Sequence, residues 1–151
     1  MRMRTTARSG WRTWRWRSAT AGRIAPPEAC VIVRHAALAL AQLHRWQLPH
    51  GDVRPGNLWL DAQGHARLLQ DPTLLPSPWP LGAADPDGSL TARADYAAPE
   101  LQQPGKMPDP QTDIYSLGCC FYHMITGQPP FAGGDVAQKF QRHMAEPIQP
   151  L

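Results

Sequence analysis

Residues 50–57 have the sequence His50-Gly51-Asp52-Val53-Arg54-Pro55-Gly56-Asn57, in which a carboxylate, a cation and an amide recur at short spacing. Pro55 and Gly56 mark a tight turn, because neither residue type continues a helix or a strand ladder well. A loop of this kind can aim Asp52, Arg54 and Asn57 at one point. Asp and Asn also satisfy backbone groups in ordinary turns, so a purely structural role is the alternative interpretation.

The overall composition predicts one loop-rich α+β domain. The chain has 151 residues, of which 42% are hydrophobic, and this is enough for a core of ordinary size. Its 17 prolines and 12 glycines exceed average usage, which predicts interrupted elements and long connections.

Basic residues are concentrated at the start of the chain. Seven of the 15 cations precede Glu28, the first acidic residue, so the rest of the chain carries 8 cations against 12 anions. Trp11, Trp14 and Trp16 stand among these arginines. We predict a basic, Arg/Trp-rich, disordered leader at residues 1–24, because high charge without an apolar face does not support folding. The alternative is an arm that binds nucleic acid or a membrane interface.

The cysteines and histidines predict neither a disulfide framework nor a metal cluster. Cys30, Cys119 and Cys120 are odd in number and lack C-x-x-C spacing, which predicts a reducing, cytoplasmic location. The histidines other than His50 are predicted to occupy isolated core or surface positions. We expect no transmembrane segment, because no apolar run has the length needed to cross a bilayer.

A first helix is predicted from Pro26-Pro27-Glu28 to about His44. Proline suits a first helical turn, and Glu28 complements the positive end of the helix dipole. The apolar residues that recur at helical spacing are Ile32, Ala36, Ala39, Leu40 and Leu43. Pro49 prevents further helix and leads the chain into residues 50–57.

Two short strands are predicted after Asn57. Residues 58–60 and 65–69 flank Asp61-Ala62-Gln63-Gly64, which has the composition of a hairpin turn. Residues 71–95 contain five prolines and are predicted to lack regular structure.

Two more helices are predicted in the second half of the chain. Thr112-Asp113 is expected to cap the first of them and Gly127 to end it. We expect this helix to be central and buried, because it has little polar surface. Its core positions are predicted to be Ile114, Leu117, Phe121, Met124 and Ile125. The last helix is predicted from Asp135 to about Met144, with Val136, Phe140 and Met144 on its apolar face.

From Pro26 to Leu151 the chain resembles the C-terminal lobe of a Ser/Thr protein kinase, particularly of the bacterial kinases of eukaryotic type. Residues 50–57 look like the catalytic loop. Tyr96-Ala97-Ala98-Pro99-Glu100 resembles the end of the activation segment, and Asp113-Ile114-Tyr115-Ser116-Leu117-Gly118 resembles the start of the buried central helix. Three such motifs in the family's order argue against a chance match. The resemblance implies a partial, mainly α-helical domain at residues 25–151 with a short β-hairpin, without the N-terminal lobe or the last helices.

The resemblance also implies roles for individual side chains. Asp52 would accept the proton of a substrate hydroxyl, Arg54 would face the transferred phosphate, and Asn57 would hold a magnesium ion. The implied cofactors are ATP and Mg²⁺, bound in part by Arg54 and Asn57, and the implied substrate is a protein. Asp113 is expected to accept hydrogen bonds from the backbone of the catalytic loop. Structural roles are implied for His50, Tyr96, Pro99 and Glu100.

Two departures from the family concern the nucleotide and its metal. No glycine-rich strand pair precedes Pro26, and no lysine precedes Lys106. Counting from Asn57 places Gln70 where the family has its metal-binding aspartate, and a neutral amide is a poor substitute for a carboxylate on a hard dication. A one-residue bulge would bring Asp71 into that position instead.

Further departures surround the catalytic loop. Gly51 stands where the family usually has an arginine, so the usual clamp on a phosphorylated activation segment is absent. Arg54 replaces a lysine and differs from it in shape and reach. Arg93 occupies the position of a threonine that normally contacts Asp52, and we expect it to add bulk beside that carboxylate. Glu100 is expected to lack its arginine partner, which would cost stability.

These observations predict a truncated, degenerate kinase-like domain that is inactive or strongly impaired in phosphoryl transfer. We expect it to act as a binding or scaffold module for a partner protein, without specific nucleic-acid binding. One alternative is the catalytic lobe of an active kinase whose N-terminal lobe is supplied elsewhere or lost through a wrong start. The other is nucleic-acid or membrane binding by the arm at residues 1–24.

Overall fold

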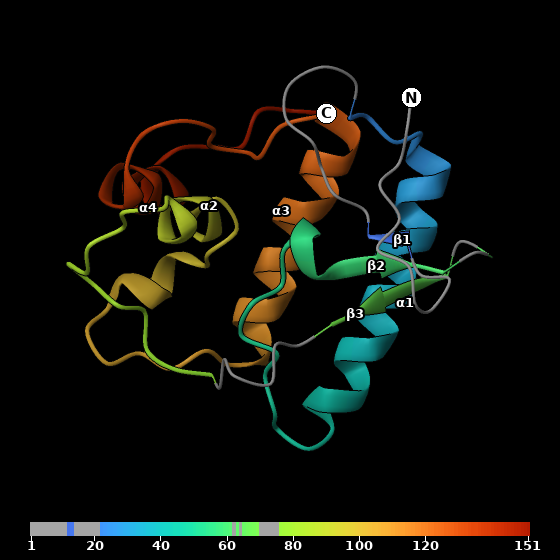
Figure 1. The fold of residues 1–151 in the computed structure, drawn as a ribbon, viewed down its shortest axis with the longest axis horizontal. Helices are drawn as coiled ribbons and strands as arrows, with labels where there is room; N and C mark the ends of the chain where they lie inside the picture. Colours follow the sequence, from blue (N-terminus) through green and yellow to red (C-terminus); the bar gives the residue numbers. More distant parts are fainter. Residues whose placement is uncertain (1–11, 14–21, 62, 64, 70–75) are drawn as a thin grey trace.

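The computed structural model describes residues 12–13, 22–61, 63, 65–69 and 76–151 (Figure 1). In these ranges a small antiparallel sheet packs with two long helices, and shorter helical elements form a second group beside them. The fold is therefore mixed α and β, as predicted. None of the helices in these ranges is both long and apolar enough to cross a membrane.

The two long helices, α1 (Pro26–His44) and α3 (Pro110–Thr126), lie side by side (Figure 1). The predicted bounds of α1 are confirmed, with proline in its first turn. Its apolar face contacts α3 and the sheet, which together enclose the first hydrophobic core. The fully buried side chains on this face are Ala29, Ile32, Ala36 and Leu40.

The start of α3 differs from the prediction. Asp109, not Thr112-Asp113, is the N-cap: its Oδ1 accepts hydrogen bonds from the backbone N–H of Gln111 (2.9 Å) and Thr112 (3.0 Å). Thr112 completes a capping box, because its Oγ1 accepts the N–H of Asp109 at 3.1 Å. The Asp113 carboxylate is thereby left available for other partners. Gly127 ends the helix in the left-handed region, at φ 83°, as predicted.

One side of α3 faces outward. Leu117 and Met124 are buried in the first core as predicted, but Ile114 is 54% exposed. The prediction of a core position for Ile114 was therefore wrong. The sequence concealed this asymmetry, because the polar residues Thr112, Asp113 and Ser116 of α3 are buried and do not mark its open side.

The sheet contains β1 (Arg12–Thr13), β2 (Leu58–Leu60) and β3 (Ala66–Leu68) in that order, all antiparallel. The predicted hairpin is confirmed by pairing of Leu58 with Leu68 and of Leu60 with Ala66. The prediction missed β1, whose two residues pair with β2.

The segment that contains β1 was predicted to be a disordered leader. Trp11, Trp14 and Trp16 lie outside the described residues, and the domain boundary at residue 24 stays a prediction. Ile24 itself is buried in the first core, and its N–H donates to the carbonyl of Met124 at 2.7 Å.

The second group of elements comprises α2 (Ser89–Ala94), η2 (Pro99–Gln102) and α4 (Val136–Ala145). Helix α2 corrects the prediction that residues 71–95 lack regular structure. Its start is held by Asp85, whose carboxylate accepts the N–H of Leu90 (2.9 Å) and Thr91 (2.8 Å). The five prolines all precede this helix, so they do not interrupt it.

Helix α4 covers the second core. Asp135 caps it through a capping box with Gln138, which confirms the predicted start. Phe140 is fully buried and meets the ring of Trp79 edge-on, with 5.1 Å between centroids. Met144, predicted on the apolar face, is instead exposed, and His143 is buried in its place.

Candidate active-site loop

Residues 50–57 connect the end of the α1 segment to β2, and η1 (Pro55–Asn57) forms their last turn. Gly51 has φ 77°, in the left-handed region that disfavours residues with a side chain. A Cβ at this position would meet Pro108 and Pro76 at ordinary van der Waals distance, so the backbone conformation rather than space accounts for the glycine.

The backbone at the start of the loop is held by Asp113 from α3. Its Oδ2 accepts the N–H of His50 at 2.7 Å, and its Oδ1 accepts the N–H of Gly51 at 2.8 Å. His44, the last residue of α1, contacts Oδ2 through Nε2 at 2.8 Å. Asp113 is 1% exposed, so these three contacts replace its hydration. The backbone bonds are those that the resemblance implies, whereas nothing in the sequence indicated the contact with His44.

His50 is buried and contacts the backbone of Asp52, two residues further along the chain. The N–H of Asp52 lies 3.3 Å from His50 Nδ1, and Nε2 lies 3.0 Å from the carbonyl of Leu69. Because Nδ1 accepts a hydrogen bond, Nε2 carries the proton and donates it to Leu69. His50 therefore joins the catalytic-loop segment to the end of β3.

The side chain of Asp52 is surrounded by donors. Arg54 Nε donates to Oδ2 and Arg93 Nε donates to Oδ1, both at 3.0 Å. Asn57 Nδ2 donates to Oδ2 at 2.8 Å and to the backbone carbonyl of Asp52 at 2.7 Å. The structure thus brings together the three predicted catalytic residues, and it adds Arg93 from α2. Asp52 remains 14% exposed, so the cluster lies at the surface.

Arg93 changes what this cluster can do. We predicted that Arg93 only adds steric bulk beside Asp52, but in the structure the two side chains form an ion pair. Each carboxylate oxygen of Asp52 now carries a guanidinium, which stabilises the negative charge and competes with any substrate hydroxyl for the lone pairs. The resemblance indicated that Arg93 lies near Asp52, but not that the two side chains form a hydrogen bond.

Helix α2, which carries Arg93, is fixed by α4. The buried Lys139 donates from Nζ to the carbonyl of Thr91 at 3.1 Å and forms a short ion pair with Asp95. Burial raises the pKa of Asp95, and the ammonium of Lys139 opposes this shift. Arg93 is also positioned over the ring of Trp79, with 5.2 Å from its Cζ to the ring centroid. The position of Arg93 is therefore set by two helices and an aromatic side chain.

The other three predicted structural residues, Tyr96, Pro99 and Glu100, have different surroundings. The Tyr96 hydroxyl donates to His123 Nδ1 at 2.7 Å, and the two rings stack. Burial raises the pKa of Tyr96 and lowers the pKa of His123 to about 4, so both groups are neutral at pH 7. Pro99 starts η2, and Glu100 beside it is partly buried, with no ion pair within the described ranges.

The described residues do not by themselves form a magnesium site. Asn57 uses its amide nitrogen on Asp52, which leaves its oxygen as one hard ligand. The Asp52 carboxylate is bound to two guanidinium groups, and no group of three or more acidic, histidine or cysteine side chains elsewhere in the described chain is arranged for a metal. Gln70 and Asp71, the two residues weighed for the metal position, lie outside the described ranges.

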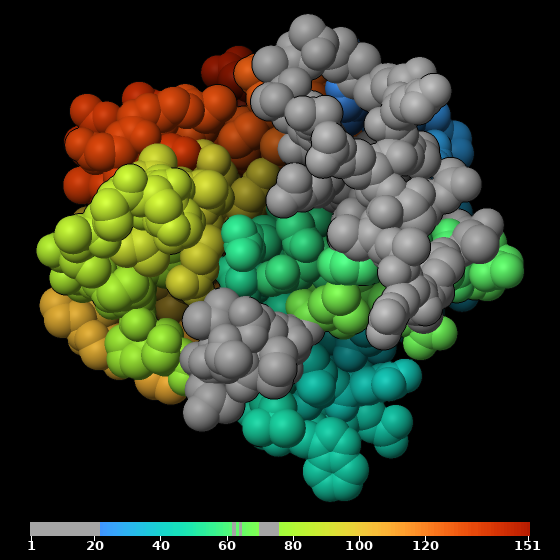
Figure 2. All heavy atoms as spheres, in the orientation of Figure 1, coloured from blue at the N-terminus to red at the C-terminus, as the bar shows by residue number. Residues whose placement is uncertain are grey.

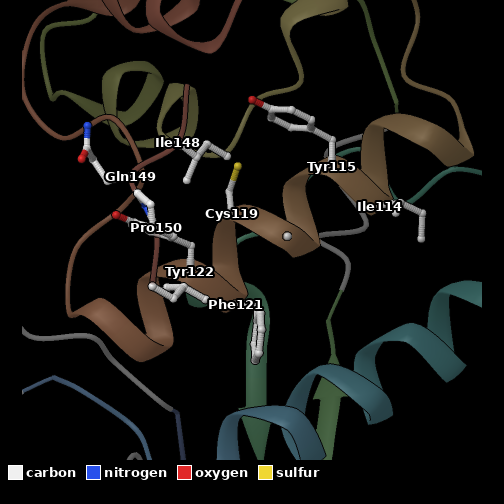
Figure 3. A pocket seen from close by; sticks show the side chains of 10 residues that line it. Ile114, Tyr115, Cys119, Phe121, Tyr122, Ile148, Gln149 and Pro150 are labelled. Atoms are coloured by element: carbon white, nitrogen blue, oxygen red, sulfur yellow. The ribbon is translucent and has the colours of Figure 1, made fainter. Parts of the chain in front are cut away.

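A groove lies on the outward side of α3 (Figure 3). It has a volume of about 490 Å³ and is lined by apolar residues of α3 and by residues 148–151. Tyr115 and Cys119 lie on its wall, and the exposed Ile114 lies at its edge. Neither Asp52 nor any of its partners lines this groove.

Comparisons with known proteins identify the family to which the sequence belongs. The sequence profile of the protein kinase domain matches residues 12–150. The Ser/Thr protein kinase PknB of Mycolicibacterium smegmatis is 33% identical over 140 residues, which cover 87% of this chain and 21% of PknB. PkaB of Streptomyces coelicolor, also a Ser/Thr protein kinase, is 34% identical over 139 residues, which cover 85% of this chain and 32% of PkaB. The chain therefore spans between about a fifth and a third of the length of these relatives.

Proposed function

Because the chain belongs to the protein kinase domain family, we propose that it is a kinase-like module that binds a partner protein and whose own phosphoryl transfer is absent or strongly impaired. The observation that carries this proposal is the set of hydrogen bonds that the Asp52 carboxylate accepts. Both of its oxygens accept hydrogen bonds from guanidinium groups, from Arg54 and Arg93, at 3.0 Å.

The chemistry of the reaction explains why these contacts matter. A general base must come within hydrogen-bond reach of the hydroxyl proton that it removes. The lone pairs of the Asp52 carboxylate point at Arg54 and Arg93 rather than at a substrate hydroxyl. ATP and Mg²⁺ are used by the family in general. Their binding by this chain depends on residues beyond Asn57, which offers one oxygen ligand.

The test is a transfer assay on the purified chain with Mg-ATP and a generic Ser/Thr-containing protein. We expect the wild type to incorporate no more phosphate than Asp52→Ala. Arg93→Thr tests whether the ion pair between Arg93 and Asp52 causes the impairment, because threonine has no positive charge to pair with the carboxylate. Arg34→Ala, an exposed arginine on α1, is the matched control for loss of one positive charge. Robust wild-type transfer that Asp52→Ala abolishes would overturn the proposal.

A second candidate function is the catalytic lobe of an active Ser/Thr kinase whose complementary lobe is supplied by another chain or by upstream sequence. The anchoring of residues 50–57 by Asp113, together with the contact between Asn57 and Asp52, favours it. Translating the nucleotide sequence upstream of Met1 in all frames distinguishes the candidates. A glycine-rich strand pair followed by a lysine would support the active kinase, and the lack of both would count against it.

A further inference from the structure

The two arginines beside Asp52 have donors to spare. A guanidinium carries five N–H groups, and Arg54 and Arg93 each use only Nε on the carboxylate. Their terminal Nη groups have no acceptor among the residues that the structure describes. A free guanidinium fork at a polar surface matches the geometry of carboxylate and phosphate oxygens.

The charge of the cluster favours an anion. Two guanidinium groups face one carboxylate, so Asp52, Arg54 and Arg93 together carry one net positive charge. The side chain of Arg54 is 32% exposed and that of Arg93 is 23% exposed, so water, and therefore a ligand, reaches both. In the space-filling view the green atoms of the loop region lie at the surface beside the yellow-green segment that carries α2 (Figure 2).

Arg93 is also held in place before any ligand arrives. Its guanidinium lies over Trp79, which is itself buried against Phe140. Lys139 holds the backbone of α2 through the carbonyl of Thr91. A pre-oriented guanidinium loses less conformational entropy on binding than a mobile one, which increases affinity.

We propose that Arg54 and Arg93 bind the phosphate group of a phosphorylated serine or threonine side chain of a partner protein. The inference rests on the proposed function, because a chain that does not transfer phosphate is free to retain a phosphorylated side chain at the same loop. Asp52 acts here as a counter-ion that holds both arginines through their Nε groups. Its negative charge opposes the phosphate and so limits the affinity for it. A doubly charged phosphate supplies more negative charge than Asp52 leaves unbalanced, so it competes for the free Nη groups.

The binding test uses three probes without magnesium: serine phosphate capped at both ends, capped serine, and ATP. Binding is followed by calorimetry and by the Nε–Hε NMR signals of the arginines. We expect capped phosphoserine to bind at least about tenfold more tightly than capped serine, because charge-assisted hydrogen bonds supply the difference. ATP distinguishes a nucleotide phosphate from a protein phosphate as the source of the same group.

Two variants move the affinity in opposite directions. Arg93→Gln removes one guanidinium and should weaken capped phosphoserine binding about tenfold. Asp52→Asn removes the competing negative charge and should tighten it about threefold or more. Arg34→Gln, which removes an exposed arginine remote from the loop, should leave it unchanged. A variant that merely failed to fold could not tighten binding, so Asp52→Asn keeps the test decisive if Arg93→Gln proves unstable.

Three results would overturn the inference: equal affinity for capped phosphoserine and capped serine, phosphoserine binding that survives Arg93→Gln in a folded variant, and Arg93-dependent binding of ATP alone. Failure of the proposed function is a separate result. It is detected as robust phosphate transfer by the wild type with Mg-ATP, whereas the binding experiment contains neither magnesium nor a transferable substrate.

Discussion

Asp113 and Asp52 are two carboxylates that contact the same loop in different ways. Asp113 lies beneath the loop, is 1% exposed, and accepts two backbone N–H groups. Asp52 lies within the loop and is 14% exposed, and its carboxylate oxygens accept only side-chain donors among the described residues, from Arg54, Arg93 and Asn57.

This difference in hydrogen-bond donors gives the two carboxylates different roles: Asp113 fixes the backbone of the loop, and Asp52 binds side chains that can move. A backbone donor cannot be withdrawn from Asp113 without moving the chain, so the loop and that carboxylate hold each other in place. A guanidinium can leave Asp52 by rotation of its side chain, with the backbone unchanged. The partners of Asp113 are therefore fixed, whereas other groups can compete for the partners of Asp52.

Loss of Asp113 should have the largest effect on stability. Asp113→Ala leaves the N–H groups of His50 and Gly51 unsatisfied in a buried site, which we expect to cost about 3–5 kcal/mol of unfolding free energy. Asp52→Ala should cost about 1 kcal/mol, because its partners reach water. Urea denaturation followed by circular dichroism measures both.

If Asp113→Ala does not fold, Asp113→Asn gives the same comparison, because an amide keeps one acceptor oxygen for the loop. We expect its loss to exceed that of Asp52→Asn. Equal losses for the two asparagine variants would contradict the distinction between the two carboxylates.

A third carboxylate, Asp95, is intermediate between Asp113 and Asp52, and loss of its cation should have the next largest effect on stability. Its partner Lys139 is buried, so Lys139→Met leaves Asp95 without its cation in a site where burial already raises its pKa. We expect a loss of about 2 kcal/mol, less than for an obligatory charge because Asp95 takes up a proton instead.

The matched control for Lys139 is Lys106→Met. Lys106 pairs with Asp109 at 3.0 Å, but both side chains are about a third exposed. Such pairs contribute about 0.5 kcal/mol or less. Comparable losses for the two lysine variants in urea denaturation would show that burial does not determine the strength of these pairs.

Much of the fold could be predicted because its signals are local. The bounds of α1, the β2–β3 hairpin, the cap at Asp135 and the end of α3 at Gly127 all follow from periodicity or from residue types that favour one backbone conformation. One error, at the start of α3, arose because the local signal was ambiguous. Asp109 and Thr112 are both residue types that cap helices well. In the structure Asp109 is the N-cap, and Thr112 is the third helical residue, which completes the capping box.

The partners in the site were harder to predict because they are distant in sequence. His44 lies 69 residues before Asp113, and Arg93 lies 41 residues after Asp52. No spacing rule links such pairs, since their contact depends on how whole helices pack. The resemblance supplied the loop and its anchor, but Arg93 is a departure from the family pattern, so its ion pair had no precedent there. The catalytic and metal roles of Asp52, Arg54, Asn57 and Asp71 stay predictions.

Acidification tests a different kind of acceptor, the imidazole. Tyr96 donates to His123 and Tyr115 donates to His143, each at 2.7 Å, and burial lowers the pKa of both histidines to about 4. Their unfolded-state pKa is near 6.5, so the unfolded chain binds more protons between about pH 6.5 and 4. The stability present above pH 6.5 should therefore be lost as the pH falls through this window.

We expect the loss between pH 7 and pH 5 to be on the order of 1 kcal/mol, after allowance for solvent screening. Chemical denaturation at each pH measures it. His143→Gln removes one of the two titrating groups, so the slope of unfolding free energy against pH should become shallower. An unchanged slope in both His143→Gln and His123→Gln would mean that these histidines are not protonated on unfolding.

Salt should produce the smallest effect, and it bears most directly on the two carboxylates. Raising NaCl from about 0.05 to 0.5 M shortens the screening length and weakens partly exposed ion pairs, so the stability deficit of Asp52→Asn should shrink by a few tenths of a kcal/mol. The deficit of Asp113→Asn should change less, because Asp113 is buried and salt screens buried interactions much less than exposed ones. Equal salt sensitivity of the two deficits, measured by urea denaturation, would place both carboxylates in the same electrostatic environment. A selective response of Asp52 would instead show that ions from solution reach its arginines, as phosphate binding to their Nη groups requires.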